Sequence, residues 1–117
     1  MKAKTYKSGD CRITKIRMIR EVNNCMCHNF YFEIRWRVYA GELAYYRGNF
    51  VVWFDTDDLY DFYEKDTFSK ADIRSYAEEL AGCFLSDAPL NPTAETMRAF
   101  FAKCRESIEH YNETRAA

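Results

Sequence analysis

The sequence predicts an α+β domain: a three-stranded antiparallel meander followed by two amphipathic helices, in the order β-β-β-α-α. Three observations predict this class. Apolar and polar residues alternate along residues 30–40, which is typical of a half-buried strand. A second alternating segment, residues 44–54, follows after a short turn, so the two segments are expected to form a hairpin. Apolar residues in 73–84 and 97–111 recur at intervals of three and four, as on one side of a helix.

The length and composition of the chain limit its class. Its 117 residues predict one globular domain over residues 1–117, with a polar and flexible start at residues 1–8. No apolar stretch approaches the roughly 20 residues that span a bilayer, and no apolar segment of a signal peptide follows the basic start. The odd number of cysteines, five, favours reduced thiols. We therefore expect a cytoplasmic protein with no membrane partner.

The first strand is expected in residues 11–22, which are rich in β-branched side chains. The apolar residues Ile13, Ile16, Ile19 and Val22 recur at every third position rather than every second. This interval predicts either a strand with a β-bulge or a helix. The Asn-Asn pair that follows predicts a turn.

The register of the central hairpin can be argued from its side chains. A slip of one residue would send every core residue to the solvent face. If the numbers of opposite residues sum to 84, Phe30 lies opposite Phe54 and Trp36 lies opposite Gly48. The large indole ring then fills the space beside the glycine. We expect this register, with a short loop around residues 41–43.

Two helices are expected directly after the sheet. Thr56 is placed to cap a short extra helix, with acidic residues favourable at its positive end. Ser69 and Asp72 resemble a capping box, which predicts that a longer helix starts there and ends near Leu85.

A last helix is expected to begin with Asn91 as its N-cap and Pro92 as its first residue. It is expected to end near Asn112. Both long helices are expected to cover one face of the sheet, so the other face stays open to solvent.

The odd-numbered side chains of the hairpin are expected on that open face. They mix arginine with aromatic rings, a composition found at binding surfaces for proteins and for nucleic acids. Arg37 would lie opposite Arg47, a like-charge pair that is unfavourable without a bound anion. The predicted partner-binding residues are Tyr31, Arg35, Arg37, Tyr39, Tyr45, Arg47 and Trp53. Residues that could extend the basic area are Lys2, Lys4, Lys7, Arg12, Lys15, Arg17 and Arg20.

A second candidate surface is the acidic segment at residues 55–66. Its carboxylates are interleaved with tyrosine, so they could imitate a row of phosphates and occupy the nucleic-acid-binding groove of another protein. Solubility and helix capping are the alternative reason for these acids. The acidic residues are Asp55, Asp57, Asp58, Asp61, Glu64 and Asp66.

No motif in the sequence names a reaction. His28 and His110 have no serine or cysteine partner at a recognisable spacing, and no glycine-rich phosphate loop is present. Cys25, Cys27 and His28 form the one cluster of metal-ligand type, but zinc sites usually need a second cysteine pair. We therefore expect no catalytic residue, no metal, no cofactor and no enzymatic activity.

An aromatic-rich α+β chain with the acidic segment 55–66 and no catalytic signature resembles small inhibitor proteins of phages and mobile elements, namely the anti-CRISPR inhibitors. The resemblance implies a protein that blocks a nucleic-acid-binding or nuclease surface of a CRISPR effector. We expect a small non-enzymatic protein-binding module of this kind. The alternative is a nucleic-acid-binding protein that uses the arginine, tyrosine and tryptophan face of its sheet, although acidic residues outnumber basic ones by 18 to 17. The open face could also close a homodimer.

Overall fold

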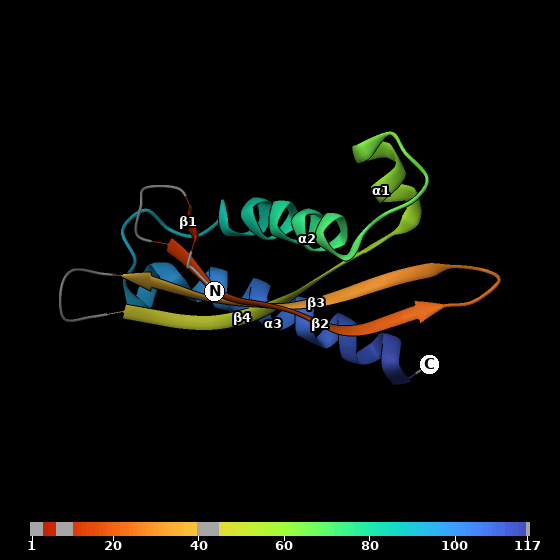
Figure 1. Ribbon diagram of the computed structural model, residues 1–117. Coiled ribbons are helices and arrows are strands. Elements are labelled where there is room, and N and C mark those ends of the chain that lie inside the picture. Colours follow the sequence, from red (N-terminus) through yellow and green to blue (C-terminus); the bar gives the residue numbers. More distant parts are fainter. Residues whose placement is uncertain (1–3, 7–10, 40–44, 117) are drawn as a thin grey trace.

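The computed structural model describes residues 4–6, 11–39 and 45–116, and it contains an antiparallel sheet with the strand order β1-β2-β3-β4 (Figure 1). The strands are β1 (Lys4–Tyr6), β2 (Cys11–Asn23), β3 (His28–Tyr39) and β4 (Tyr45–Asp55). The helices are α1 (Thr56–Tyr63), α2 (Lys70–Leu85) and α3 (Ala94–Ala116). The predicted α+β class is confirmed, including the meander, the two long helices and the short extra helix.

The start of the chain adds one strand to the predicted sheet. Lys4–Tyr6 pairs with β2 as a short edge strand, which the sequence did not predict. A flexible start was expected at residues 1–8, of which residues 1–3, 7 and 8 lie outside the described residues. The expected loop at residues 41–43 lies outside them too.

The predicted register of the hairpin is confirmed. Phe30 pairs with Phe54, and Trp36 pairs with Gly48. A Cβ atom at position 48 would lie 2.6 Å from a carbon of the Trp36 ring, which is too close for any side chain. Glycine is therefore the residue that lets the indole ring lie against β4.

Two irregularities in β2 explain its three-residue repeat. The pairing with β3 shifts by one residue at Thr14 and again at Ile19. The first shift leaves Ile13 and Ile16 in the same buried cluster, whereas Ile19 and Val22 pack in a separate cluster. Each bulge moves the following side chains to the other face, as one extra residue must in a structure of period two.

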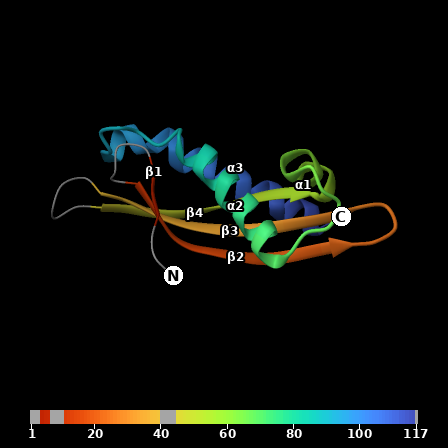
Figure 2. The ribbon, with the colours of Figure 1, turned by 45° about the horizontal axis from the view of Figure 1, so that its top comes forward.

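The helices do not all cover the same face of the sheet. Figure 1 shows α1 and α2 above the sheet, whereas α3 runs obliquely behind it and its C-terminal end lies below. Figure 2 shows α2 crossing the strands at an angle. Met97, Phe100 and Cys104 of α3 join the main core, and Ile108 and Tyr111 join the cluster on the opposite face.

The crossing point of α3 is at the edge of β4. There the backbone N–H of Val51 donates a hydrogen bond of 3.1 Å to the Ser107 hydroxyl. Beyond Ser107 the helix packs on Tyr31 and Val51. The prediction that both long helices cover one face, leaving the other wholly open, is therefore wrong.

The caps of the first two helices are set by side-chain hydrogen bonds. Asp55, not Thr56, caps α1: its carboxylate accepts from the N–H of Asp58 at 2.9 Å, and the Asp58 carboxylate accepts from the N–H of Asp55 at 3.0 Å. The predicted box at Ser69 and Asp72 is confirmed, with distances of 3.1 and 3.0 Å.

The last helix begins later than predicted and ends later. The Thr93 hydroxyl accepts from the N–H of Thr96 at 3.1 Å, so Thr93 occupies the capping position and Asn91 lies outside the helix. The helix continues past Asn112, because Tyr111 is buried against the sheet and holds its last turns in place.

Candidate functional site

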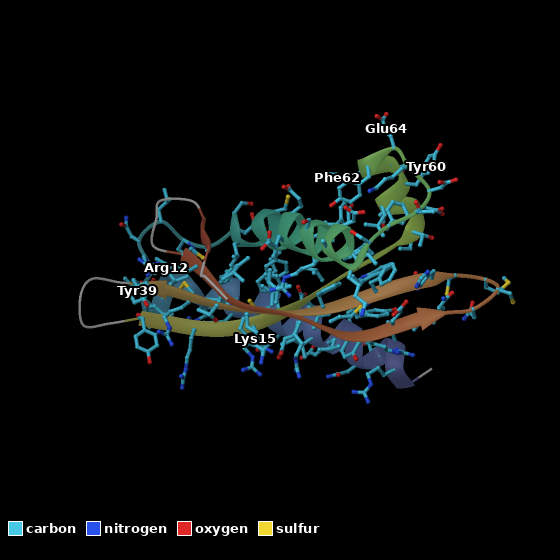
Figure 3. All side chains as sticks on the ribbon, in the orientation of Figure 1. Arg12, Lys15, Tyr39, Tyr60, Phe62 and Glu64 are labelled. Carbon is cyan, nitrogen blue, oxygen red and sulfur yellow. The ribbon has the colours of Figure 1, made fainter. Side chains whose placement is uncertain are left out.

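The part of the opposite face that α3 leaves uncovered carries rows of basic side chains across three strands. Arg12 of β2 pairs with Arg37 of β3, which pairs in turn with Arg47 of β4. In the next row Lys15 pairs with Arg35. Adjacent strands lie about 4.8 Å apart, so each row brings its charges close together. We call Arg12, Lys15, Arg35, Arg37 and Arg47 the basic face; Lys15 and Arg12 are labelled in Figure 3.

Tyrosine rings support two arginines of the first row. The guanidinium of Arg12 lies 4.9 Å from the centre of the Tyr39 ring, and that of Arg37 lies 4.7 Å from the centre of the Tyr45 ring. A hydrogen bond between Arg37 and Tyr39 raises the pKa of the guanidinium and lowers the pKa of the phenol. The stacking fixes the guanidinium groups on the face.

Among the residues that the structure describes, no carboxylate balances the charge of the first row. Arg12, Arg37 and Arg47 form no ion pair with any residue of the described ranges. The Nε atom of Arg37 is shielded from solvent and lacks a hydrogen-bond partner among those residues. Like charges on directly opposite residues destabilise a sheet, so this row favours a bound anion.

Within the described ranges, Glu33 is the acidic residue beside the basic face. Its carboxylate accepts hydrogen bonds from Arg17 at 2.9 Å and from Asn49 at 3.1 Å, and it lies 3.5 Å from the Arg35 Nε atom. Burial alone would raise the pKa of Glu33, but these two hydrogen bonds and the charges of Arg35 and Arg17 outweigh it and lower the pKa. Glu33 therefore stays ionised at neutral pH and partly neutralises Arg17 and Arg35.

Two hollows flank Glu33 on this side of the sheet. The first has a volume of about 520 Å³, and the second has a volume of about 640 Å³. The first is lined by Thr14, Glu33, Arg35, Trp36, Arg37, Arg47, Gly48 and Asn49. The second is lined by Arg17, Met18, Ile19, Arg20, Glu33, Tyr111 and Arg115.

Five of the seven predicted partner-binding residues lie together on the uncovered surface: Arg35, Arg37, Tyr39, Tyr45 and Arg47. Tyr31 does not lie with them, because α3 covers it. Its ring packs on Tyr111 with 5.4 Å between the ring centres, and only 6% of the residue is exposed. The apolar neighbours Ile19 and Val51 on the same face were the sequence signal that something covers this region.

Trp53 is exposed but separate from the basic face. Its ring lies 6.5 Å from the ring of His110 in α3. Val51, the residue between Trp53 and Asn49 on this face, is buried beneath α3. Helix α3 therefore stands between Trp53 and the row that contains Arg47.

The acidic segment 55–66 lies on the other side of the molecule. Asp55 and Asp58 are engaged in the cap of α1, whereas the other four acids are exposed. Tyr60 and Phe62 are also exposed, by 56% and 52%, and Figure 3 shows them near Glu64 on α1. We call α1 and the residues to 66 the acidic protrusion. The acidic protrusion and the basic face therefore lie on different sides of the molecule.

The cysteine and histidine cluster lies at the turn between β2 and β3. Nε2 of His28 lies 2.6 Å from a carboxylate oxygen of Glu21, while the side chain of Asn24 accepts from the N–H of Met26 and of Cys27. Within the described ranges no three histidine, cysteine or acidic side chains gather as a metal site would require. Cys104 belongs to the core, where burial raises the pKa of its thiol to about 11.

No helix in the described part of the chain is both long and apolar enough to cross a membrane. None of the protein-family models, curated proteins and solved structures compared with the chain matches it.

Proposed function

We propose that this chain is a non-enzymatic binding module and that its basic face binds nucleic acid. One observation carries the proposal: Arg12, Arg37 and Arg47 lie side by side on three strands without a carboxylate partner among the described residues. Phosphate groups would relieve the repulsion in this row. Guanidinium groups bind phosphate through paired, charge-assisted hydrogen bonds, which makes arginine well suited to the task.

The tyrosines beside the row favour unpaired bases as part of the ligand. Tyr45 is about half exposed, and its ring centre lies 6.3 Å from that of Tyr39. Exposed rings on a sheet can stack on bases that are not already stacked in a duplex. Such stacking contributes roughly 1–3 kcal/mol per base. The basic face therefore combines the phosphate and base contacts that single strands require.

A fluorescence-anisotropy titration tests this proposal. The probes are labelled single-stranded DNA, single-stranded RNA and duplex DNA of equal length. We expect the single strands to bind more tightly than the duplex, and we expect the double variant R37A/R47A to lose at least tenfold in affinity.

The matched control is K70A/R98A, which removes two exposed charges from α2 and α3, away from the basic face. It should bind within about twofold of the parent. An equal loss in K70A/R98A, or no binding of any probe at low salt, would contradict the proposal.

A second candidate function rests on the acidic protrusion. Tyr60 and Phe62 are exposed among carboxylates, whereas the neighbouring Lys65 pairs with Asp72 of α2 at 2.7 Å. Exposed aromatic and acidic side chains together suit a basic groove on another protein. This is the arrangement that the resemblance to anti-CRISPR inhibitors implies.

The second candidate function is tested by adding this protein to purified CRISPR effector nucleases and measuring how far guide-directed DNA cleavage falls. We expect the parent to inhibit cleavage and the charge-reversal variant D57K/D61K not to inhibit it. The reversal E106K/E109K on the exposed side of α3 is the control and should inhibit as the parent does. Equal inhibition by the two reversals would remove the acidic protrusion as the contact surface.

A homodimer through the basic face is disfavoured by charge. A two-fold axis places the same patch of both copies together, so the row of arginines would face or border its own copy. The cost would be largest at Arg37, which already lies between Arg12 and Arg47. A partner of opposite charge fits this surface better.

A further inference from the structure

The second hollow is a further basic site that lies apart from the row of three arginines. The Arg20 guanidinium lies 5.7 Å from the centre of the Tyr31 ring, and the Arg115 guanidinium lies 5.8 Å from the centre of the Tyr111 ring. The two rings pack on each other. This stack joins β2, β3 and α3, and it holds two guanidinium groups at the wall of one hollow.

The charge of the second hollow is only partly balanced. Arg20 and Arg115 form no ion pair with the residues that the structure describes, and Arg17 shares Glu33 with Arg35. Three guanidinium groups therefore line this hollow beside a single carboxylate. Such an excess of fixed positive charge favours an anion there.

Glu33 lines both hollows, so they meet at its side chain. Arg37 of the first hollow and Tyr31, which pairs with Arg20 of the second, are six positions apart on β3. At roughly 3.3 Å per residue this separation is about 20 Å. A stacked strand advances about 3.4 Å per nucleotide and a strand with splayed bases advances further, so at most about six nucleotides span it.

We propose that a single strand of nucleic acid runs along β3 and binds phosphates in both hollows, one on each side of Glu33. This inference rests on the proposed function and adds a second site, formed by Arg17, Arg20 and Arg115. Short strands reach only the first site. Longer strands pass the Glu33 carboxylate and gain the second, so affinity depends on length.

A length series with labelled oligothymidylates of three, six, nine and twelve nucleotides tests this inference on the full chain. We expect affinity to rise at least tenfold between the trimer and the nonamer and to change little beyond it. The variant R20Q/R115Q removes both charges but keeps side-chain atoms over the tyrosine rings. It should bind the trimer as the parent does and lose the rise with length.

The melting temperature of R20Q/R115Q shows whether the stack survives. If that variant unfolds, R115Q alone replaces it, since Arg115 is exposed in the last turn of α3. Equal binding of trimer and nonamer by the parent, or an equal loss for both lengths in the variant, would overturn the second site and leave the proposed function standing. No binding at any length would overturn both.

Discussion

Arg37 and Arg47 lie directly opposite each other on β3 and β4, next to the pair formed by Trp36 and Gly48. The two pairs depend on one register. The apolar pair on the core side fixes it, because the Trp36 ring occupies the space that a side chain at position 48 would need. The packing of the core therefore holds two positive charges together on the other face.

Substituting Gly48 with alanine tests this dependence. The new Cβ atom would lie 2.6 Å from the Trp36 ring, so the indole or the strand must shift. Overpacking of this kind costs about 1–3 kcal/mol of unfolding free energy, which urea denaturation measures. The control is G82A in α2, where alanine should be neutral or stabilising. A G48A protein as stable as the parent would show that the ring does not lie against β4.

The crossing of α3 over the edge of β4 predicts a large effect at Tyr111. This residue is 9% exposed and covers Tyr31. We expect Y111A to lose about 2–4 kcal/mol of unfolding free energy, as for other large core residues. Y60A, on the exposed side of α1, should stay within about 0.5 kcal/mol of the parent. Similar stability of the two variants would mean that the end of α3 does not pack on the sheet.

Substituting Glu33 with glutamine should raise the affinity for single strands and lower the unfolding free energy at neutral pH. The change removes the negative charge between the two hollows and releases Arg17 and Arg35 from their ion pair. Nonamer affinity, measured by anisotropy, should therefore rise by roughly threefold to tenfold. Weaker binding by E33Q than by the parent would argue against a phosphate path past this residue.

The pH dependence of stability follows from the lowered pKa of Glu33. Its ordinary value is 4.5, and the folded protein holds it below that value. The ionised carboxylate therefore stabilises the fold above pH 4.5, and this contribution disappears as the pH falls through the folded pKa. Parent and E33Q should differ most in unfolding free energy at neutral pH and converge in acid. A difference that grows toward low pH would contradict the assignment.

The tyrosines of the basic face should matter for binding much more than for stability. Y39A/Y45A removes both rings beside the arginine row. We expect at least a fivefold loss of affinity for single strands, since each stacked base contributes roughly 1–3 kcal/mol. Duplex DNA, whose bases are already stacked, should lose less. An equal loss for both ligands would mean that the rings act only by positioning Arg12 and Arg37.

The sequence contains enough information for the central hairpin. Strict alternation and the match of Trp36 with Gly48 identify both faces of β3 and β4. The three-residue spacing in β2 predicts either a bulged strand or a helix; in a strand, Ile13 and Ile16 can share a face only if one residue is extra, and the structure has the bulge. Local patterns suffice where neighbouring strands pack on one another.

The path of α3 could not be read from its own pattern. A helix of 23 residues is about 34 Å long, and one continuous stripe from Met97 to Tyr111 fits either one face of a sheet or two. The edge crossing depends on Ser107 meeting the free backbone N–H of Val51, a contact between distant parts of the chain. The contribution of Arg115 to the second hollow follows from that crossing.

The charge pattern was informative about surfaces but not about their partners. The sequence shows a basic first half and an acidic segment at residues 55–66, and the structure places them on different sides. The sequence could not show that Arg12 joins Arg37 and Arg47 in one row, because the bulge at Thr14 sets that alignment.

The most direct test of the central claim is the salt dependence of single-strand binding in the parent and in R37A/R47A. Each phosphate contact changes the slope of log K against log salt by about −0.7 for a single strand. If the basic face binds phosphates, the parent should show a slope of about −2 or steeper. The double variant should be shallower by about 1.4. Two parallel lines, or a parent that does not bind at low salt, would contradict the assignment of nucleic-acid binding to this face.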